Sequence, residues 1–230
     1  MIDRAAWLES RRHFLGASEV AAVCGLDPFK TPLDVWASKK GLLKDESSTA
    51  KDMGNLFEAP LLSYYAQRNK RTLSHPGTMM HPDFPWMAAT PDAVTTCRRN
   101  VQTKIVGARM LWHWDPGAPD YVQVQTQAEM SVAGLAVTDV VACLGGTDYR
   151  EFEVKRDDSV IGYIIEICAR FWRDHVEADA VPAVDGSDSA RQILSARFPK
   201  PTTGMEDAVP EFIEMALRYQ EIGRAVSTVE

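Results

Sequence analysis

The chain has 230 residues, of which 45% are apolar and 25% charged, and its formal net charge is −7. This is the composition of an ordinary globular protein, and the length suffices for one α/β domain with a sizeable core. The negative charge argues against a surface that binds nucleic acid everywhere, but it is compatible with a local basic track.

No apolar run approaches the roughly 18 residues needed to cross a bilayer. Residues 1–14 carry charges where a signal peptide would have an apolar core. The four cysteines are scattered, without a CxxC pair or a Cys/His cluster, which argues against a zinc site or a disulfide framework. We therefore expect a soluble cytoplasmic protein with reduced thiols and no membrane partner.

In chain order, residues 1–45 are predicted to be largely helical. A first helix is expected over residues 19–26, with Ser18 as its N-cap. A second helix is expected over residues 33–43, after the helix breaker Pro32.

The polar stretch 45–52 predicts a loop, and residues 55–70 predict a helix. The apolar side of this helix consists of Leu56, Leu61, Leu62 and Tyr65. Pro60 suits the helix only if it lies in the first turn, where its missing N–H costs nothing.

Between residues 72 and 106 the pattern changes to short segments divided by Pro, Asp and Asn, which predicts a β-meander. A loop over residues 109–120 and a helix over residues 120–134, ended by Gly134, follow.

Two further strands, residues 137–144 and 150–156, are joined by the turn GGTD. A long helix over residues 160–178 then leads to a C-terminal helical extension, residues 179–230, with a last helix at 211–226. The order of elements predicts an α/β fold with one mixed central β-sheet flanked by helices. We expect a single domain over residues 1–230.

The residues that indicate chemistry are Asp92, Gln102 and Lys104, on two neighbouring predicted strands. Hydrolysis of a phosphodiester needs oxygen ligands for Mg²⁺ and a cation that steadies the attacking water and the transition state. Positions 102 and 104 share one face of a strand, so both can point at a metal held by Asp92. Taken alone, this spacing is a weak signal, and a polar strand face is the more common explanation for it.

Flanking helices carry further polar groups of the right kind. Glu58 lies on the helix before the strands, and Gln125 and Gln127 lie on the helix after them. In isolation, each fits the solvated face of an amphipathic helix equally well.

The order of these motifs resembles the lambda-exonuclease and YqaJ-like viral recombinase family of PD-(D/E)xK nucleases. The resemblance covers residues 11–172, about 70% of the chain, and each of its motifs is weak singly. The motifs are RRHFLGAS from Arg11 to Ser18, GNLFE ending at Glu58, ATPD ending at Asp92, Gln102-Thr103-Lys104, and YVQVQTQAEMSVAG. The resemblance implies a restriction-endonuclease-like fold.

The family's metal ligands fall on Asp92, position 102, the backbone carbonyl of Thr103, and Glu58. They imply one or two Mg²⁺ ions, with Mn²⁺ as a substitute. Lys104 corresponds to the catalytic lysine.

The family's QxQ motif falls best on Gln125 and Gln127, because Met130 and Gly134 then align as well. Gln125 is then the active-site glutamine. A register two residues earlier would choose Gln123.

Arg11 and Ser18 correspond to the residues that bind the 5′-phosphate of the DNA end, with Thr90 as a helper. A guanidinium suits this task because it makes forked hydrogen bonds to phosphate oxygens. Arg12 could exchange roles with Arg11, and a solvated helix end remains the alternative for the pair.

The resemblance implies a 5′-to-3′ exonuclease that degrades one strand of double-stranded DNA from a 5′-phosphorylated end. It also implies a homotrimeric ring threaded by DNA, which would combine a basic lining with an acidic exterior. A single-strand annealing protein would be the recombination partner, and the setting would be a phage or prophage protein in the bacterial cytoplasm.

Gln102 departs from the family, which has an acid at this position. Glutamine is nearly isosteric with glutamate but uncharged, so we expect weaker metal binding and a large loss of turnover, with the fold kept. Either the glutamine is an introduced Glu→Gln substitution that traps substrate, or it belongs to a natural protein that binds DNA ends without cutting. The retention of the other motif residues, Glu58, Asp92, Lys104, Gln125 and Arg11, favours the first. A purely structural protein is a third alternative.

Overall fold

The structure, a computed structural model, describes residues 9–43, 48–184 and 188–197. Its contacts divide the chain into two units, Met1–Ala196 and Arg197–Glu230. The first unit contains all the predicted site residues. The predicted helix over residues 211–226 lies outside the described residues, as do residues 1–8 and the predicted loop residues 45–47.

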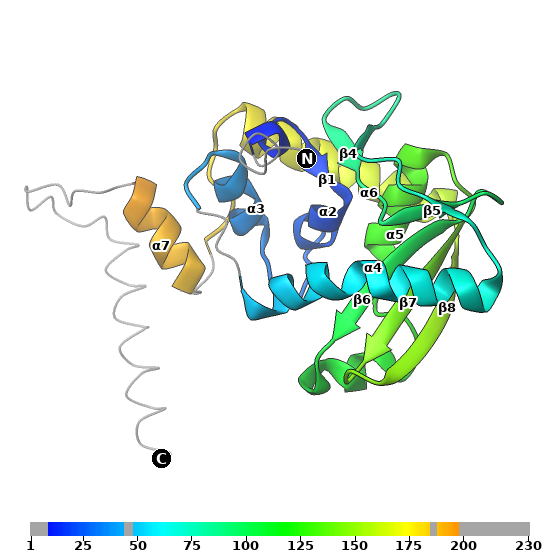
Figure 1. The fold of residues 1–230 in the computed structure, drawn as a ribbon. Helices are drawn as coiled ribbons and strands as arrows, with labels where there is room; N and C mark the ends of the chain where they lie inside the picture. Colours follow the sequence, from blue (N-terminus) through cyan, green and yellow to red (C-terminus); the bar gives the residue numbers. More distant parts are fainter. Residues whose placement is uncertain (1–8, 44–47, 185–187, 198–230) are drawn as a thin grey trace, which may run out of the picture. The chain divides into compact units, whose positions relative to one another are not determined.

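The described part of the chain forms nine helical segments and eight strands; Figure 1 shows their arrangement. The helical segments are η1 (Arg11–His13), α2 (Ala17–Val23), α3 (Pro32–Lys39), α4 (Thr49–Asn69), η2 (Ala108–Trp114), α5 (Asp120–Ala133), α6 (Asp158–Phe171), η3 (Trp172–Glu177) and α7 (Asp188–Arg197). The strands are β1 (Leu15–Gly16), β2 (Leu73–Ser74), β3 (Met79–Met80), β4 (Met87–Ala89), β5 (Ala93–Thr95), β6 (Asn100–Val106), β7 (Val137–Leu144) and β8 (Asp148–Lys155).

The main sheet has five strands in the order β2-β5-β6-β7-β8. The neighbours β6 and β7 are parallel, and the other pairs are antiparallel. Helix α5 makes the crossover that two parallel strands require. The predicted mixed sheet with flanking helices is therefore confirmed.

A second sheet of three strands, in the order β1-β4-β3, was not predicted. The single meander expected over residues 72–106 is wrong, because β4 pairs with β1 from the N-terminal region instead of joining its sequence neighbours in the main sheet. The strand pair β1–β4 is parallel, with Leu15 opposite Met87 and Gly16 opposite Ala88.

Helices cover both faces of the main sheet. Successive residues of a strand point to opposite faces, so neighbouring residues pack against different helices. Val101 and Val141 share a buried cluster with Leu62 of α4. Val140, on the other face of β7, shares a cluster with Val122 of α5. Positions 100, 102 and 104 of β6 accordingly lie on the α5 side of the sheet.

Helix α4 is longer than expected at its N-terminal end. The Ser48 side chain caps it by accepting a hydrogen bond of 3.3 Å from the Lys51 backbone N–H. Residues 49–52 are therefore helical and not part of a loop, and Pro60 lies in the middle of the helix instead of its first turn.

Helix α2 begins at Ala17, so the N-cap is Gly16 and not Ser18. The carboxylate of Glu19 accepts a hydrogen bond of 2.8 Å from the Gly16 N–H. Ser18 consequently lies within the first turn, with an exposed side chain.

The later elements agree more closely with the expectations. Gly134 ends α5 with a φ of 61°, and the Asp157 side chain caps α6 by accepting from the backbone N–H groups of Ser159 and Val160. Where a loop was expected, η2 forms a 3-10 helix and buries Trp114 completely. Among the helices that the structure describes, none is both long enough and apolar enough to span a membrane.

Candidate active site

The antiparallel pairing of β5 and β6 brings Asp92 to Gln102. Ala93 lies opposite Val101, and Val94 lies opposite Asn100. One residue before Ala93, in the same register, Asp92 reaches the side of β6 that carries Gln102. This neighbourhood follows from strand pairing alone.

The Asp92 carboxylate is surrounded by hydrogen-bond donors. Its Oδ2 atom accepts from the backbone N–H and the hydroxyl of Thr103, both at 2.7 Å, and from Nε2 of Gln102 at 2.9 Å. Burial raises the pKa of Asp92, while the two hydrogen bonds from Thr103 act in the opposite direction.

The Gln102 amide nitrogen lies between two predicted metal ligands. It donates to Asp92 and also to the Thr103 carbonyl oxygen, which is 3.3 Å away. An amide N–H₂ therefore faces the two oxygens that are predicted to hold a cation. A glutamate in this place would turn an acceptor toward them instead.

Lys104 and Gln102 both contact Gln125 of α5. The Lys104 ammonium donates to Oε1 of Gln125 at 2.9 Å, and Nε2 of Gln125 donates to Oε1 of Gln102 at 3.2 Å. The same nitrogen donates to Oε1 of Glu129 at 2.7 Å. Because an ammonium has only donors and a carboxylate only acceptors, the two charged partners fix which way the Gln125 amide points.

The expected alternative Gln123 does not reach this cluster; its amide donates to the Ala118 carbonyl at 2.7 Å. The second glutamine of the motif, Gln127, is buried and ties α5 to the start of α6. It donates to the Lys155 carbonyl at 2.7 Å and accepts from the Asp157 N–H at 2.9 Å.

Glu58 of α4 lies close enough to interact electrostatically with Asp92. Burial, followed by the charge of Asp92, raises the pKa of Glu58, and nearby His75 opposes the shift. The ring Nδ1 of His75 is 2.7 Å from the Asp92 carbonyl oxygen. The sequence analysis missed His75, which occurs in a short segment with no motif of its own.

Glu129 was missed as well, although it stands four residues after Gln125 and so shares its helix face. Its side chain is 1% exposed. It accepts hydrogen bonds of 2.7 Å from the amides of Gln125 and Asn100. Burial, and next the charge of Asp92, raises the pKa of Glu129 to about 7.

The donor atoms suit a hard divalent cation at every position except 102. Asp92, Glu58 and the Thr103 carbonyl offer oxygens, the ligands that Mg²⁺ prefers. Among the residues that the structure describes, no three His, Cys, Asp or Glu side chains are gathered closely enough to hold a metal ion. A cation at this site would therefore have few charged ligands.

The predicted phosphate-binding residues Arg11 and Ser18 lie together. The Arg11 guanidinium donates to the Ser18 hydroxyl at 3.3 Å and is 3.5 Å from the Glu19 carboxylate. Buried Lys39, which the sequence analysis did not single out, pairs with Glu19 at 2.6 Å and donates to the Arg11 carbonyl at 2.9 Å. Lys39 thus holds the segment that carries Arg11.

Arg12 points elsewhere and forms an exposed ion pair of 2.9 Å with Glu9. Thr90 shares a hydrogen bond of 2.9 Å with Thr78. Because β1 and β4 are parallel and each ends just before these residues, Ser18 and Thr90 follow the same edge of the small sheet. Asp92 follows Thr90 by two residues, which connects the predicted phosphate site to the predicted metal site.

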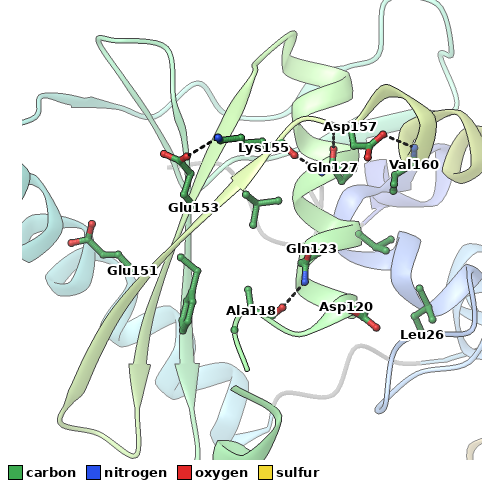
Figure 2. A pocket seen from close by; sticks show the side chains of 14 residues that line it. Leu26, Ala118, Asp120, Gln123, Gln127, Glu151, Glu153, Lys155, Asp157 and Val160 are labelled. Atoms are coloured by element: carbon green, nitrogen blue, oxygen red, sulfur yellow. Dashed lines mark hydrogen bonds and ion pairs between the residues drawn. The ribbon is translucent and has the colours of Figure 1, made fainter. Parts of the chain in front are cut away.

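A cavity of about 720 Å³ lies on another side of α5, against β8 and the start of α6 (Figure 2). Gln123 and Gln127 line it, and the residues predicted to bind metal or phosphate do not. Its charged lining residues are Asp120, Glu151, Glu153, Lys155 and Asp157. Four carboxylates against one lysine would repel a phosphate, so we do not assign DNA binding to this cavity.

Comparisons with known proteins identify a matching family and two relatives. A family model described as the YqaJ-like viral recombinase domain matches residues 6–136. The uncharacterized protein YqaJ of Bacillus subtilis (strain 168) is 28% identical over 204 residues, which are 86% of this chain and 64% of that protein. An uncharacterized protein of Acanthamoeba polyphaga mimivirus is 26% identical over 155 residues, 60% of this chain and 28% of that protein. This chain thus spans less than two thirds of either relative.

Solved structures share the fold at low sequence identity. An alkaline exonuclease from Laribacter hongkongensis, in complex with dAMP, superimposes with a TM-score of 0.65 at 20% identity, covering 76% of this chain and 93% of that one. A putative exonuclease from Eubacterium rectale gives a TM-score of 0.59 at 11% identity, covering 92% and 98%. These likenesses show the fold.

Proposed function

This chain belongs to the family of the YqaJ-like viral recombinase domain, and from that membership we propose that it is a nuclease of DNA recombination. In full, the proposal is a Mg²⁺-dependent 5′-to-3′ exonuclease that acts on double-stranded DNA ends. The fold shared with an alkaline exonuclease supports the nuclease activity.

One observation carries the proposal most directly. Asp92, position 102 and Lys104 converge from two paired strands, and Gln125 joins position 102 to Lys104. This is the juxtaposition that a metal-assisted hydrolysis of a phosphodiester needs: oxygen ligands beside an ammonium group.

Asp92, Glu58 and the Thr103 carbonyl would hold the Mg²⁺, for which Mn²⁺ can substitute. Bound Mg²⁺ neutralises phosphate charge and lowers the pKa of the attacking water. The Lys104 ammonium, held by the Gln125 carbonyl oxygen, lies where it can orient that water and offset charge on the phosphate. Asp92 is positioned by Thr103 before any substrate arrives.

Gln102 is expected to impair this chemistry, whether it is natural or introduced. Its amide nitrogen donates to Asp92 and to the Thr103 carbonyl, so it competes with a cation for both oxygens. To act as a ligand the amide would have to turn over. That motion would set its N–H₂ against the N–H₂ of Gln125, which Lys104 and Glu129 hold in place.

The same observation favours a second function, a DNA-end-binding module without catalysis. Gln102 donates a hydrogen bond to the Asp92 carboxylate, so this carboxylate has a partner without a metal. Arg11 and Ser18, which are proposed to bind the end phosphate, contact each other and do not depend on position 102. Such a protein would protect or mark 5′-phosphorylated ends instead of degrading them.

Arg11, Ser18 and Thr90 are proposed to bind the 5′-phosphate of the end, with Arg12 as the alternative arginine. A preference for this phosphate would set the 5′-to-3′ polarity, because the enzyme would then begin at that end. Mononucleotide products are consistent with the dAMP complex of the alkaline exonuclease, which binds a nucleoside monophosphate.

We propose further that the chain forms a homotrimeric ring and cooperates with a single-strand annealing protein, in a phage or prophage setting in the bacterial cytoplasm. A ring would let a chain with a net charge of −7 concentrate basic side chains on an inner lining.

Linear duplexes with and without a 5′-phosphate separate these functions. We expect this chain to bind the phosphorylated end more tightly in Ca²⁺, and to release mononucleotides slowly in Mg²⁺. Preferential binding with no release, even in Mn²⁺, would favour the end-binding module. Equal binding to both ends without release would contradict both functions.

A further inference from the structure

Glu129 is a carboxylate buried beside the proposed active site, and the positive charge that acts on it is that of Lys104, which is not close enough to form an ion pair. Its side chain is 1% exposed. Within the described part of the chain, no lysine or arginine forms an ion pair with it, and its hydrogen-bond donors are the amides of Gln125 and Asn100. Burying a carboxylate in this way is costly unless a positive charge comes close.

Its position relative to residue 102 is defined by a shared donor. Nε2 of Gln125 donates to Oε1 of Glu129 at 2.7 Å and to Oε1 of Gln102 at 3.2 Å. A single nitrogen atom, Nε2 of Gln125, therefore separates the Glu129 carboxylate from the side chain of Gln102, the position at which the family has an acid.

Asn100 gives an independent indication that the surroundings of Glu129 favour an anionic side chain at this position. It is fully buried, and its Nδ2 atom donates to Glu129 at 2.7 Å and to the Thr138 hydroxyl at 3.1 Å. Its Oδ1 atom is buried with no hydrogen-bond partner among the described residues. The amide thus points its donors at Glu129 although this leaves its oxygen unsatisfied, a cost that an anionic acceptor explains.

We propose that Glu129 supplies the negative charge that position 102 lacks, and so maintains the affinity of the site for a divalent cation. It is a positioning residue: its charge acts across the Gln125 amide, and not as a ligand. The proposal rests on the proposed nuclease site, since it presumes a cation that Asp92 would help to hold.

A calorimetric titration with Mn²⁺ at about pH 8, where Glu129 is ionised, tests this inference on four chains: the parent, Glu129→Gln, Gln102→Glu and the double variant. Glutamine keeps the size of Glu129 and can still accept from Gln125 with its oxygen. Its N–H₂ group then faces Asn100, whose amide can turn to offer the Oδ1 atom that has no partner in the parent, so the substitution removes mainly the charge. We expect Glu129→Gln to weaken Mn²⁺ binding about tenfold in the parent. In the Gln102→Glu background, where the acid is restored, the loss should stay below about threefold, since the two changes share one role.

Three controls define what the titration reports. Asp92→Asn should abolish the binding, which locates the cation at this site. Glu166→Gln removes an exposed helix carboxylate from α6 and should leave the affinity unchanged. Glu129→Asp keeps the charge and should stay within about threefold of the parent, and thermal melting checks that each variant is folded.

Unchanged Mn²⁺ affinity in Glu129→Gln would overturn the inference. So would an equal loss in both backgrounds, an equal loss in the Asp and Gln variants, or binding that survives Asp92→Asn. The titration needs no DNA, so failure of the nuclease proposal would show separately, as a Gln102→Glu variant that binds Mn²⁺ and degrades nothing.

Discussion

Glutamine at position 102 has an amide group where glutamate would have a carboxylate. The hydrogen bonds around position 102 determine which atom of that group faces Asp92. Gln125 is fixed by Lys104 on one side and Glu129 on the other, so it offers a donor to residue 102. A carboxylate would accept this donor with one oxygen and face Asp92 with the other. The amide accepts the donor equally well but then presents N–H₂ to Asp92.

The raised pKa of Glu129 gives a prediction for the pH dependence of stability. The folded pKa is about 7, above the ordinary value of 4.5, so the folded protein holds this proton more tightly than the unfolded chain does. This stabilising contribution is complete below about pH 4.5 and is lost as the pH rises through 7. In metal-free buffer we expect the melting temperature to fall across this range, and to fall less in Glu129→Gln. An equal fall in the variant would contradict the assignment of the proton to Glu129.

Arg11 is expected to distinguish phosphorylated from unphosphorylated DNA ends. Removing its guanidinium in Arg11→Ala should reduce the preference for a 5′-phosphate about tenfold, because the forked hydrogen bonds to phosphate are lost. Fluorescence anisotropy with labelled duplexes in Ca²⁺ measures the preference. Arg12→Ala, which breaks an exposed pair with Glu9, should have the smaller effect. The reverse order would assign the phosphate to Arg12.

At the scale of elements, helix α4 contains a proline that is expected to destabilise it. Pro60 lies in the interior of the helix and is exposed, so it removes a backbone hydrogen bond without filling the core. Pro60→Ala should therefore raise the free energy of unfolding by about 2 kcal/mol. Urea denaturation measures the change. A less stable variant would show that the proline ring makes a contact that the helix needs.

Elements with strong local signals could be predicted from the sequence. Gly134 defines the end of α5 and the Asp157 side chain defines the start of α6 by local chemistry, and the alternation of β6 places positions 102 and 104 on one side. The small sheet could not be predicted, because β1 has two residues and pairs with β4, which is about seventy residues away. Such a pairing leaves no periodic pattern in the sequence.

The candidate site was predictable to a similar degree. Asp92, Lys104 and Gln125 carry motif spacing, and the structure brings them to one cluster. Glu129 and Lys39 were missed because a charged residue on an amphipathic helix looks like part of a solvated face. Only the packing of their helices reveals that both are buried.

For the molecule as a whole, the proposed ring around DNA requires that the chain form a trimer. We expect sedimentation to give three times the mass of a single chain at micromolar concentration. A strictly monomeric protein would contradict the proposed ring, and it would leave the preference for ends to Arg11 and its neighbours alone.

Because electrostatic binding to phosphates weakens with salt, the affinity for duplex DNA should fall steeply as salt is raised.

The central claim is that the site of Asp92 and Lys104 is a nuclease site that lacks its acid at position 102. The rate at which Gln102→Glu releases nucleotides from a 5′-phosphorylated linear duplex in Mg²⁺ tests it most directly. We predict a rate about a hundredfold or more above that of the parent chain, and the loss of this gain when Lys104→Met is added. A Gln102→Glu variant no faster than its parent would contradict the claim.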